Sequence, residues 1–187
     1  MMMTAYFITI SAHMQRNLFL RHEVAQLMVS TFIKYRDAGE FELHEYVVMP
    51  NHVHLLLSIT DRERLGRVIQ LIKGGFSRSL RNHGTVFSAV WQQRYHDRRV
   101  RDKNEFLEFS NYIRQNPVRK GLVENAEDYA YSSASHNRVP GLKPPINKLE
   151  EGDASLKARS TEFLETPEDA NPKVRSTTVR SYELSNV

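Results

Sequence analysis

The sequence contains no cysteine among its 187 residues. This absence excludes disulfide bonds, thiolate metal sites and cysteine nucleophiles together. Any metal that the chain binds must therefore be held by histidine, carboxylate or amide side chains.

A long hydrophobic run is also missing. No stretch approaches the roughly 18 consecutive apolar residues that a membrane-spanning helix needs. The first residues lack the charged-then-apolar layout of a signal peptide. We therefore expect a cytoplasmic protein without a membrane partner.

The composition changes near residue 140. The preceding part has enough hydrophobic residues for one core, and we expect a single domain over residues 1–139. From Pro140 onward, prolines and mixed charges are frequent and only two residues are aromatic. We expect residues 140–187 to form a disordered C-terminal tail, because such a composition buries little apolar surface.

Hydrophobic periodicity predicts alternating strands and helices within the domain. The predicted elements are a strand at 6–10, a helix at 22–37, a hairpin of strands 42–49 and 52–59 around a turn at 50–51, a helix at 62–81, a strand or extended segment at 90–96, and a helix from 102 or 104 to 115 that Pro117 stops. This order favours an α+β fold of ferredoxin-like (RRM-like) type, an antiparallel sheet with helices packed mainly on one face.

Two histidines stand two residues apart on the second strand of the predicted hairpin, at His52 and His54. Strand side chains alternate between faces, so both imidazoles project from the same side of the sheet and can converge on one cation. Two such histidines are also common as surface or hydrogen-bonded core residues, and the pair alone does not decide between these interpretations.

A second motif lies on the last predicted helix, where Tyr112 and Asn116 are four residues apart and share a helix face. The run 49–57, MPNHVHLLL, and the run 112–123, YIRQNPVRKGLV, together resemble the REP-associated tyrosine transposases. These are single-tyrosine transposases of the HUH type, named for a His, bulky hydrophobic, His motif. The segments 90–97 and 131–133 are also similar to this family, so that the resemblance covers about residues 5–136.

The resemblance implies an HUH endonuclease fold and a DNA nicking and joining enzyme. It makes Tyr112 the nucleophile, His52 and His54 the metal ligands, Asn116 a further ligand, and Mg²⁺ or Mn²⁺ the cofactor. The expected product is a 5′-phosphotyrosine with a free 3′-hydroxyl, formed on single-stranded DNA beside a palindromic hairpin. Taken by themselves, Tyr112 and Asn116 also suit an ordinary half-buried tyrosine and a residue at a helix C-terminus.

A basic segment spans residues 62–103, which contain eleven Lys and Arg but only three acidic residues. The whole chain has a net charge of +4. Basic segments attract the DNA backbone, although arginines are also common on ordinary solvated surfaces. Phe76, Trp91 and Tyr95 lie in this segment and are candidates to stack on unpaired bases, or else to pack in the core. His96 is a candidate to assist at the site. The candidate phosphate contacts are Arg78, Arg81, Arg94, Arg98, Arg99 and Arg101.

Two other functions are compatible with these patterns. A domesticated DNA-binding regulator would keep the basic surface but have no cleavage activity. A replication initiator or plasmid relaxase would share the HUH motif, but such proteins are often larger and carry partner domains. The sequence leaves open whether the protein is a monomer or a homodimer.

Overall fold

The computed structural model describes residues 3–84 and 87–135. Within them, four antiparallel strands form one sheet in the order β2-β3-β1-β4. The strands are β1 (Thr4–Ser11), β2 (Glu42–Met49), β3 (His52–Ile59) and β4 (His96–Arg99). With helices between β1 and β2 and between β3 and β4, this is the predicted ferredoxin-like α+β topology.

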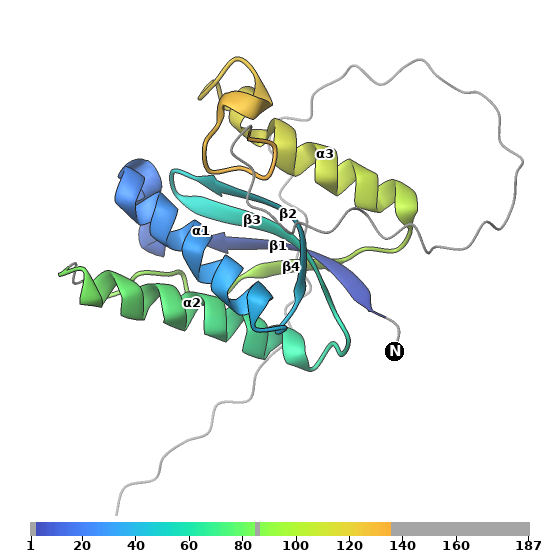
Figure 1. Ribbon diagram of the computed structural model, residues 1–187, viewed down its shortest axis with the longest axis horizontal. Coiled ribbons are helices and arrows are strands. Elements are labelled where there is room, and N and C mark those ends of the chain that lie inside the picture. Colours follow the sequence, from blue (N-terminus) through green and yellow to red (C-terminus); the bar gives the residue numbers. More distant parts are fainter. Residues whose placement is uncertain (1–2, 85–86, 136–187) are drawn as a thin grey trace, which may run out of the picture. The chain divides into compact units, whose positions relative to one another are not determined.

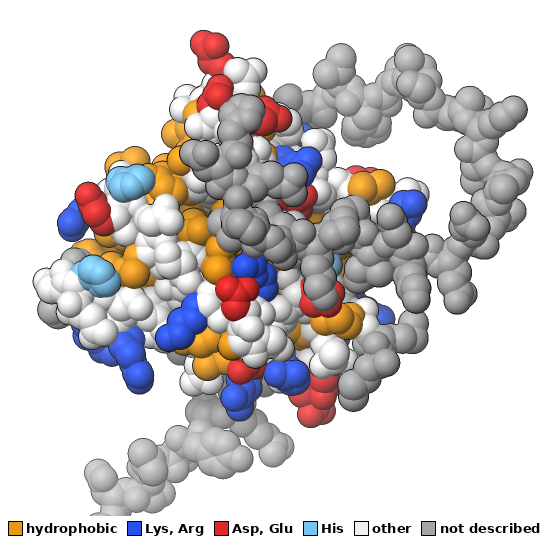
Figure 2. Space-filling model, viewed as in Figure 1, with side chains coloured by type: hydrophobic (Ala, Val, Ile, Leu, Met, Phe, Trp, Pro, Cys, Tyr) orange, Lys and Arg blue, Asp and Glu red, His pale blue; other side chains and the backbone are white. Residues whose placement is uncertain are grey.

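Helices cover both faces of the sheet (Figure 1). Two of them, α1 (His22–Asp37) and α2 (Arg64–Asn82), pack together on one face, as predicted. The third, α3 (Lys103–Arg119), lies on the opposite face against β2 and β3. Figure 2 views the α1 and α2 side, where Lys and Arg side chains lie along α2.

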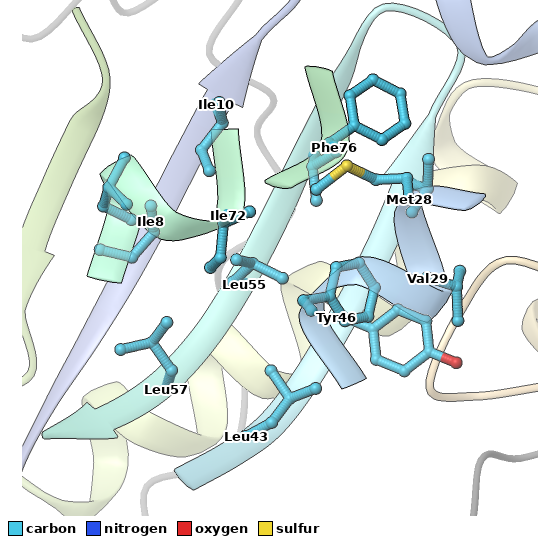
Figure 3. Close-up of a cluster of buried hydrophobic side chains, with 14 of the residues drawn as sticks. Ile8, Ile10, Met28, Val29, Leu43, Tyr46, Leu55, Leu57, Ile72 and Phe76 are labelled. Carbon is cyan, nitrogen blue, oxygen red and sulfur yellow. The ribbon is translucent and has the colours of Figure 1, made fainter. Parts of the chain in front are cut away.

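The side chains of β3 alternate as predicted, but they divide between two hydrophobic cores and not the one that was expected. Leu55 and Leu57 point to the larger core, which also contains Ile72 and Phe76 of α2, and Leu55 lies beside Ile72 (Figure 3). Leu56 points to the smaller core beneath α3. The two histidines of β3 share the face of Leu56, so they lie under α3 and not under α1 and α2.

Residues 90–96 were predicted to be a strand or an extended segment, and the structure corrects the position of the strand. The strand of this region is His96–Arg99, and the segment before it is irregular apart from a single bridge between Trp91 and Ala12. The indole nitrogen of Trp91 donates to the carbonyl of Lys73, 3.0 Å away, and its ring packs against Phe76. The aromatic and branched residues that suggested a strand serve instead to pack this segment on α2.

The predicted stop of the last helix at Pro117 is also wrong, because α3 continues to Arg119. Proline removes one backbone donor and crowds the preceding turn, but only two helical residues follow it, so little helix is disturbed. Lys120 caps the helix, and Gly121 follows it with a φ of +65°, which suits glycine. The amide of Leu122 closes the end by donating to the carbonyl of Pro117 at 2.9 Å.

The buried carboxylate of Glu45 on β2 fixes α3 to the sheet. It accepts hydrogen bonds from the Ser110 hydroxyl at 2.9 Å, from the Arg114 guanidinium at 3.0 Å and from the Ser133 hydroxyl. The chain around Ser133 also bonds to the backbone of β2. These contacts join three segments that are distant in the sequence and set the position of α3 over β2 and β3.

No helix in the described ranges is long and apolar enough to cross a membrane. The predicted C-terminal tail, residues 140–187, lies outside the described residues.

Candidate active site under helix α3

The two imidazoles of β3 converge. The Nε2 atoms of His52 and His54 are 3.1 Å apart. Two nitrogens that each bind one cation at about 2.1 Å lie roughly 3 Å apart, so this separation suits a shared metal ion. The Nδ1 atom of each ring forms a hydrogen bond. His54 Nδ1 lies 2.9 Å from the Thr9 hydroxyl, and His52 Nδ1 lies 2.6 Å from the Asn51 amide oxygen.

These outer contacts orient the rings for metal binding. The Asn51 oxygen accepts a hydrogen bond, so His52 donates from Nδ1 and its Nε2 carries a lone pair. The hydroxyl of Thr9 can likewise accept from His54 Nδ1. Both lone pairs then point to the same small volume, the arrangement that outer partners of metal-binding histidines usually produce.

Burial keeps both imidazoles neutral. It lowers the pKa of His52 to about 4, with a further contribution from the positive charge of Lys120. Burial also lowers the pKa of His54 well below its usual range, with His52 as the second cause. At neutral pH, both rings therefore keep their metal-binding lone pairs.

Tyr112 of α3 lies directly against this pair. Its ring meets the His54 ring edge to face, with 5.4 Å between centroids. The Phe7 ring of β1 stacks on His54 at 5.2 Å and contacts Tyr112 at 5.8 Å, so the three rings form one cluster. The phenol, from a distant part of the sequence, is thus held beside the imidazoles by packing.

Asn116 lies one helical turn after Tyr112 and is only 3% exposed. Its amide oxygen is buried and accepts no hydrogen bond from the described residues. A buried oxygen without a donor is unfavourable, and a bound cation would satisfy it. Two imidazole nitrogens and one amide oxygen form a donor set that fits a divalent ion, although the described ranges hold no group of three His, Cys, Asp or Glu that would do so.

His96 and Arg98 lie on the same face as this cluster, further along the sheet. His96 pairs with Thr9 across β4 and β1, and Arg98 pairs with Phe7. The Arg98 guanidinium lies 5.2 Å from the centre of the Phe109 ring and forms an ion pair with the buried Glu105. Both side chains are exposed and lie on the face of the sheet that carries the site.

The other candidate arginines are exposed, and they do not all lie on the face of the sheet that carries the site. Arg78 and Arg81 lie on α2, on the opposite side of the sheet, where they line a groove of about 530 Å³ between α1 and α2. Arg99 also points to the side of α1 and α2, because it follows Arg98 on β4 and strand side chains alternate between the two faces. Arg101 pairs with Glu105 beside Arg98, and Arg94 precedes β4.

Three supporting residues were not identified from the sequence. Thr9 and Phe7 are on β1, and only the pairing of β1 with β3 brings them to the histidines. Asn51 adjoins the motif and was interpreted only as a turn residue. Of the three aromatic candidates for base stacking, Phe76 is fully buried, whereas Trp91 and Tyr95 are partly exposed on the core edge.

Two known proteins are similar to this chain over most of its length. The REP-associated tyrosine transposase of Escherichia coli (strain K12) is 24% identical over 140 residues, which are 74% of this chain and 81% of the relative. A Haemophilus influenzae protein provisionally given the same name is 27% identical over 138 residues, 68% of this chain and 78% of the relative.

A solved structure has the same fold. It is described as the structure of the REP-associated tyrosine transposase bound to a REP hairpin, and it superposes with a TM-score of 0.62. The match has 22% sequence identity and covers 84% of this chain and 93% of that one. The family described as "Transposase IS200 like" matches residues 3–116, more than half of the sequence. The chain is therefore a member of the IS200-like transposase family.

Proposed function

We propose that this protein is a metal-dependent endonuclease and strand transferase that acts on single-stranded DNA beside a palindromic hairpin. Tyr112 is the nucleophile, and His52, His54 and Asn116 hold the metal ion. One observation carries the proposal: the phenol packs against an imidazole pair whose Nε2 atoms lie 3.1 Å apart.

The metal and Tyr112 have different roles in cleavage. Bound Mg²⁺ or Mn²⁺ would neutralise charge on a non-bridging oxygen of the scissile phosphate and orient that phosphate. The Tyr112 oxygen attacks the phosphorus, the bond from phosphorus to the 3′-oxygen breaks, and a 5′-phosphotyrosine forms. In the net reaction the phenolic proton passes to the departing 3′-oxygen, which becomes a hydroxyl.

The same ester permits rejoining. A phosphotyrosine diester is as reactive as the phosphodiester that it replaces, so a 3′-hydroxyl from another strand can attack it and release the tyrosine. No nucleotide cofactor is needed for this exchange. The sequence contains no P-loop motif, which is consistent with such a mechanism.

The DNA partner is inferred from charge and from a relative. The related structure described above was solved with a REP hairpin. Exposed arginines on both sides of the sheet supply the attraction that a DNA backbone requires. Family membership also favours a transposase over a replication initiator or relaxase.

Covalent trapping tests the proposal. The full chain is incubated with Mn²⁺ and labelled single-stranded oligonucleotides that carry a hairpin, and adducts are separated on a denaturing gel. Tyr112→Phe should bind the DNA yet give no adduct. The matched control is Tyr131→Phe, because Tyr131 packs against the larger core on the opposite face of the sheet.

Two outcomes would contradict the proposal. An undiminished adduct with Tyr112→Phe would exclude this residue as the nucleophile. Tight hairpin binding without any adduct, in Mg²⁺ or Mn²⁺, would instead favour the domesticated DNA-binding regulator.

A further inference from the structure

Two cations stand at the end of α3 next to the candidate active site. Arg119 follows Tyr112 by two helical turns, and its guanidinium carbon lies 5.6 Å from the centre of the Tyr112 ring. Lys120 is the next residue and directly follows the last residue of the helix. Both side chains are exposed, so solvent and ligands can reach them.

The backbone at this position is rigid. The amide of Lys120 donates to the carbonyl of Asn116 at 3.1 Å, and that of Gly121 donates to the carbonyl of Val118 at 2.9 Å. With the bond from Leu122 to Pro117, these contacts complete a glycine-terminated helix end. The backbone that carries Arg119 and Lys120 is therefore held in place relative to Tyr112 and Asn116.

Neither cation forms an ion pair with a carboxylate in the described part of the chain, whereas the other arginines of this face do. Arg98 and Arg101 pair with Glu105, and Arg114 pairs with Glu45. Basic residues are favourable at a helix C-terminus, which explains their charge. That effect does not explain why Arg119 lies over the phenol, and it leaves the local positive charge without a counter-ion.

We infer that Arg119 and Lys120 form a phosphate-binding site, which holds the non-bridging oxygens of a DNA phosphodiester beside the hydroxyl of Tyr112. This inference rests on the proposed function and adds two residues to it. The planar guanidinium suits two-point contact with phosphate oxygens, and the ammonium adds a point charge. Both would stabilise the negative charge that develops as the phenol attacks, and both would keep the phosphotyrosine in place for strand transfer.

Single-turnover kinetics of adduct formation test the site. The variants are Arg119→Gln and Lys120→Gln, with Lys103→Gln as the control, because Lys103 is an exposed cation at the other end of the same helix. Arg119→Gln should slow adduct formation at saturating DNA by about 100-fold, the usual effect of removing one such donor. Lys120→Gln should act in the same direction, and Arg119→Lys should recover part of the rate.

DNA affinity separates a local role from general attraction. Loss of one phosphate contact should weaken binding by less than about tenfold at moderate salt, while the rate falls much further. Equal rates for Arg119→Gln, Lys120→Gln and Lys103→Gln would overturn the inference. A loss that appears only as weaker binding would also overturn it.

A second measurement does not depend on catalysis. Inorganic phosphate is titrated into metal-free protein and followed by NMR at the Arg119 Nε–H and the Lys120 amide. Saturable shifts at both groups, abolished in Arg119→Gln, would support the site even if the wild-type protein formed no adduct. Unmoved signals would exclude the site while leaving the nucleophile assignment of Tyr112 intact.

Discussion

Acid should destabilise the metal-free protein through His52. The usual histidine pKa of about 6.5 applies to the unfolded chain, whereas burial lowers the folded value to about 4. Between these values the unfolded state binds a proton that the folded state does not. The free energy of unfolding therefore falls as the pH drops from about 6.5 towards 4, and this contribution is fully present only above that window.

The size of the effect follows from the same shift. One proton taken up by the unfolded state alone costs about 1.4 kcal/mol of stability per pH unit. From about pH 7 to pH 5, His52 should thus contribute a loss of about 2 kcal/mol. His54 should add to the loss in the same direction, because its pKa is lowered as well.

Urea unfolding in the presence of a chelator isolates the contribution of His52. His52→Gln keeps a polar side chain but cannot take up a proton in this range. Its loss of stability from about pH 7 to pH 5 should be smaller than that of the wild type by about 2 kcal/mol. If both proteins lose the same stability, to within a few tenths of a kcal/mol, burial does not hold His52 neutral and the reasoning fails.

Two further predictions concern the support of the site and the packing of the helices. Thr9→Val removes the hydroxyl that orients His54, and should weaken Mn²⁺ binding by about 10- to 100-fold in calorimetry; unchanged affinity would show that packing alone orients the ring. Gly74→Ala should stabilise the protein by about 0.5–1 kcal/mol, since a Cβ there meets nothing within 4 Å. Gly75→Ala should destabilise it by about 1 kcal/mol or more, because the new Cβ would lie 2.5 Å from the Tyr35 hydroxyl; equal melting temperatures for the two variants would contradict this packing.

Local patterns predicted most of the elements. The helix at 22–37 and the hairpin of 42–49 and 52–59 have the predicted bounds, because their periodicity and the turn between the strands are properties of neighbouring residues. The strand near residue 96 was misplaced, since hydrophobic residues that pack against a helix from an irregular segment look like a strand in the sequence. The stop predicted at Pro117 was wrong for a different reason. Proline strongly disfavours the interior of a helix, but it disturbs few hydrogen bonds in the last turn.

The sequence alone determined which residues can act together along one element. Alternation put His52 and His54 on one side of a strand, and helical spacing put Tyr112 and Asn116 on one side of a helix. Only the tertiary structure decided that these two sides face each other, that Thr9 orients one imidazole, and that the Asn116 oxygen is left without a donor. The physical reason is that spacing within an element follows from its own backbone geometry, whereas distances between elements depend on sheet order, register and the burial of residues far apart in the chain.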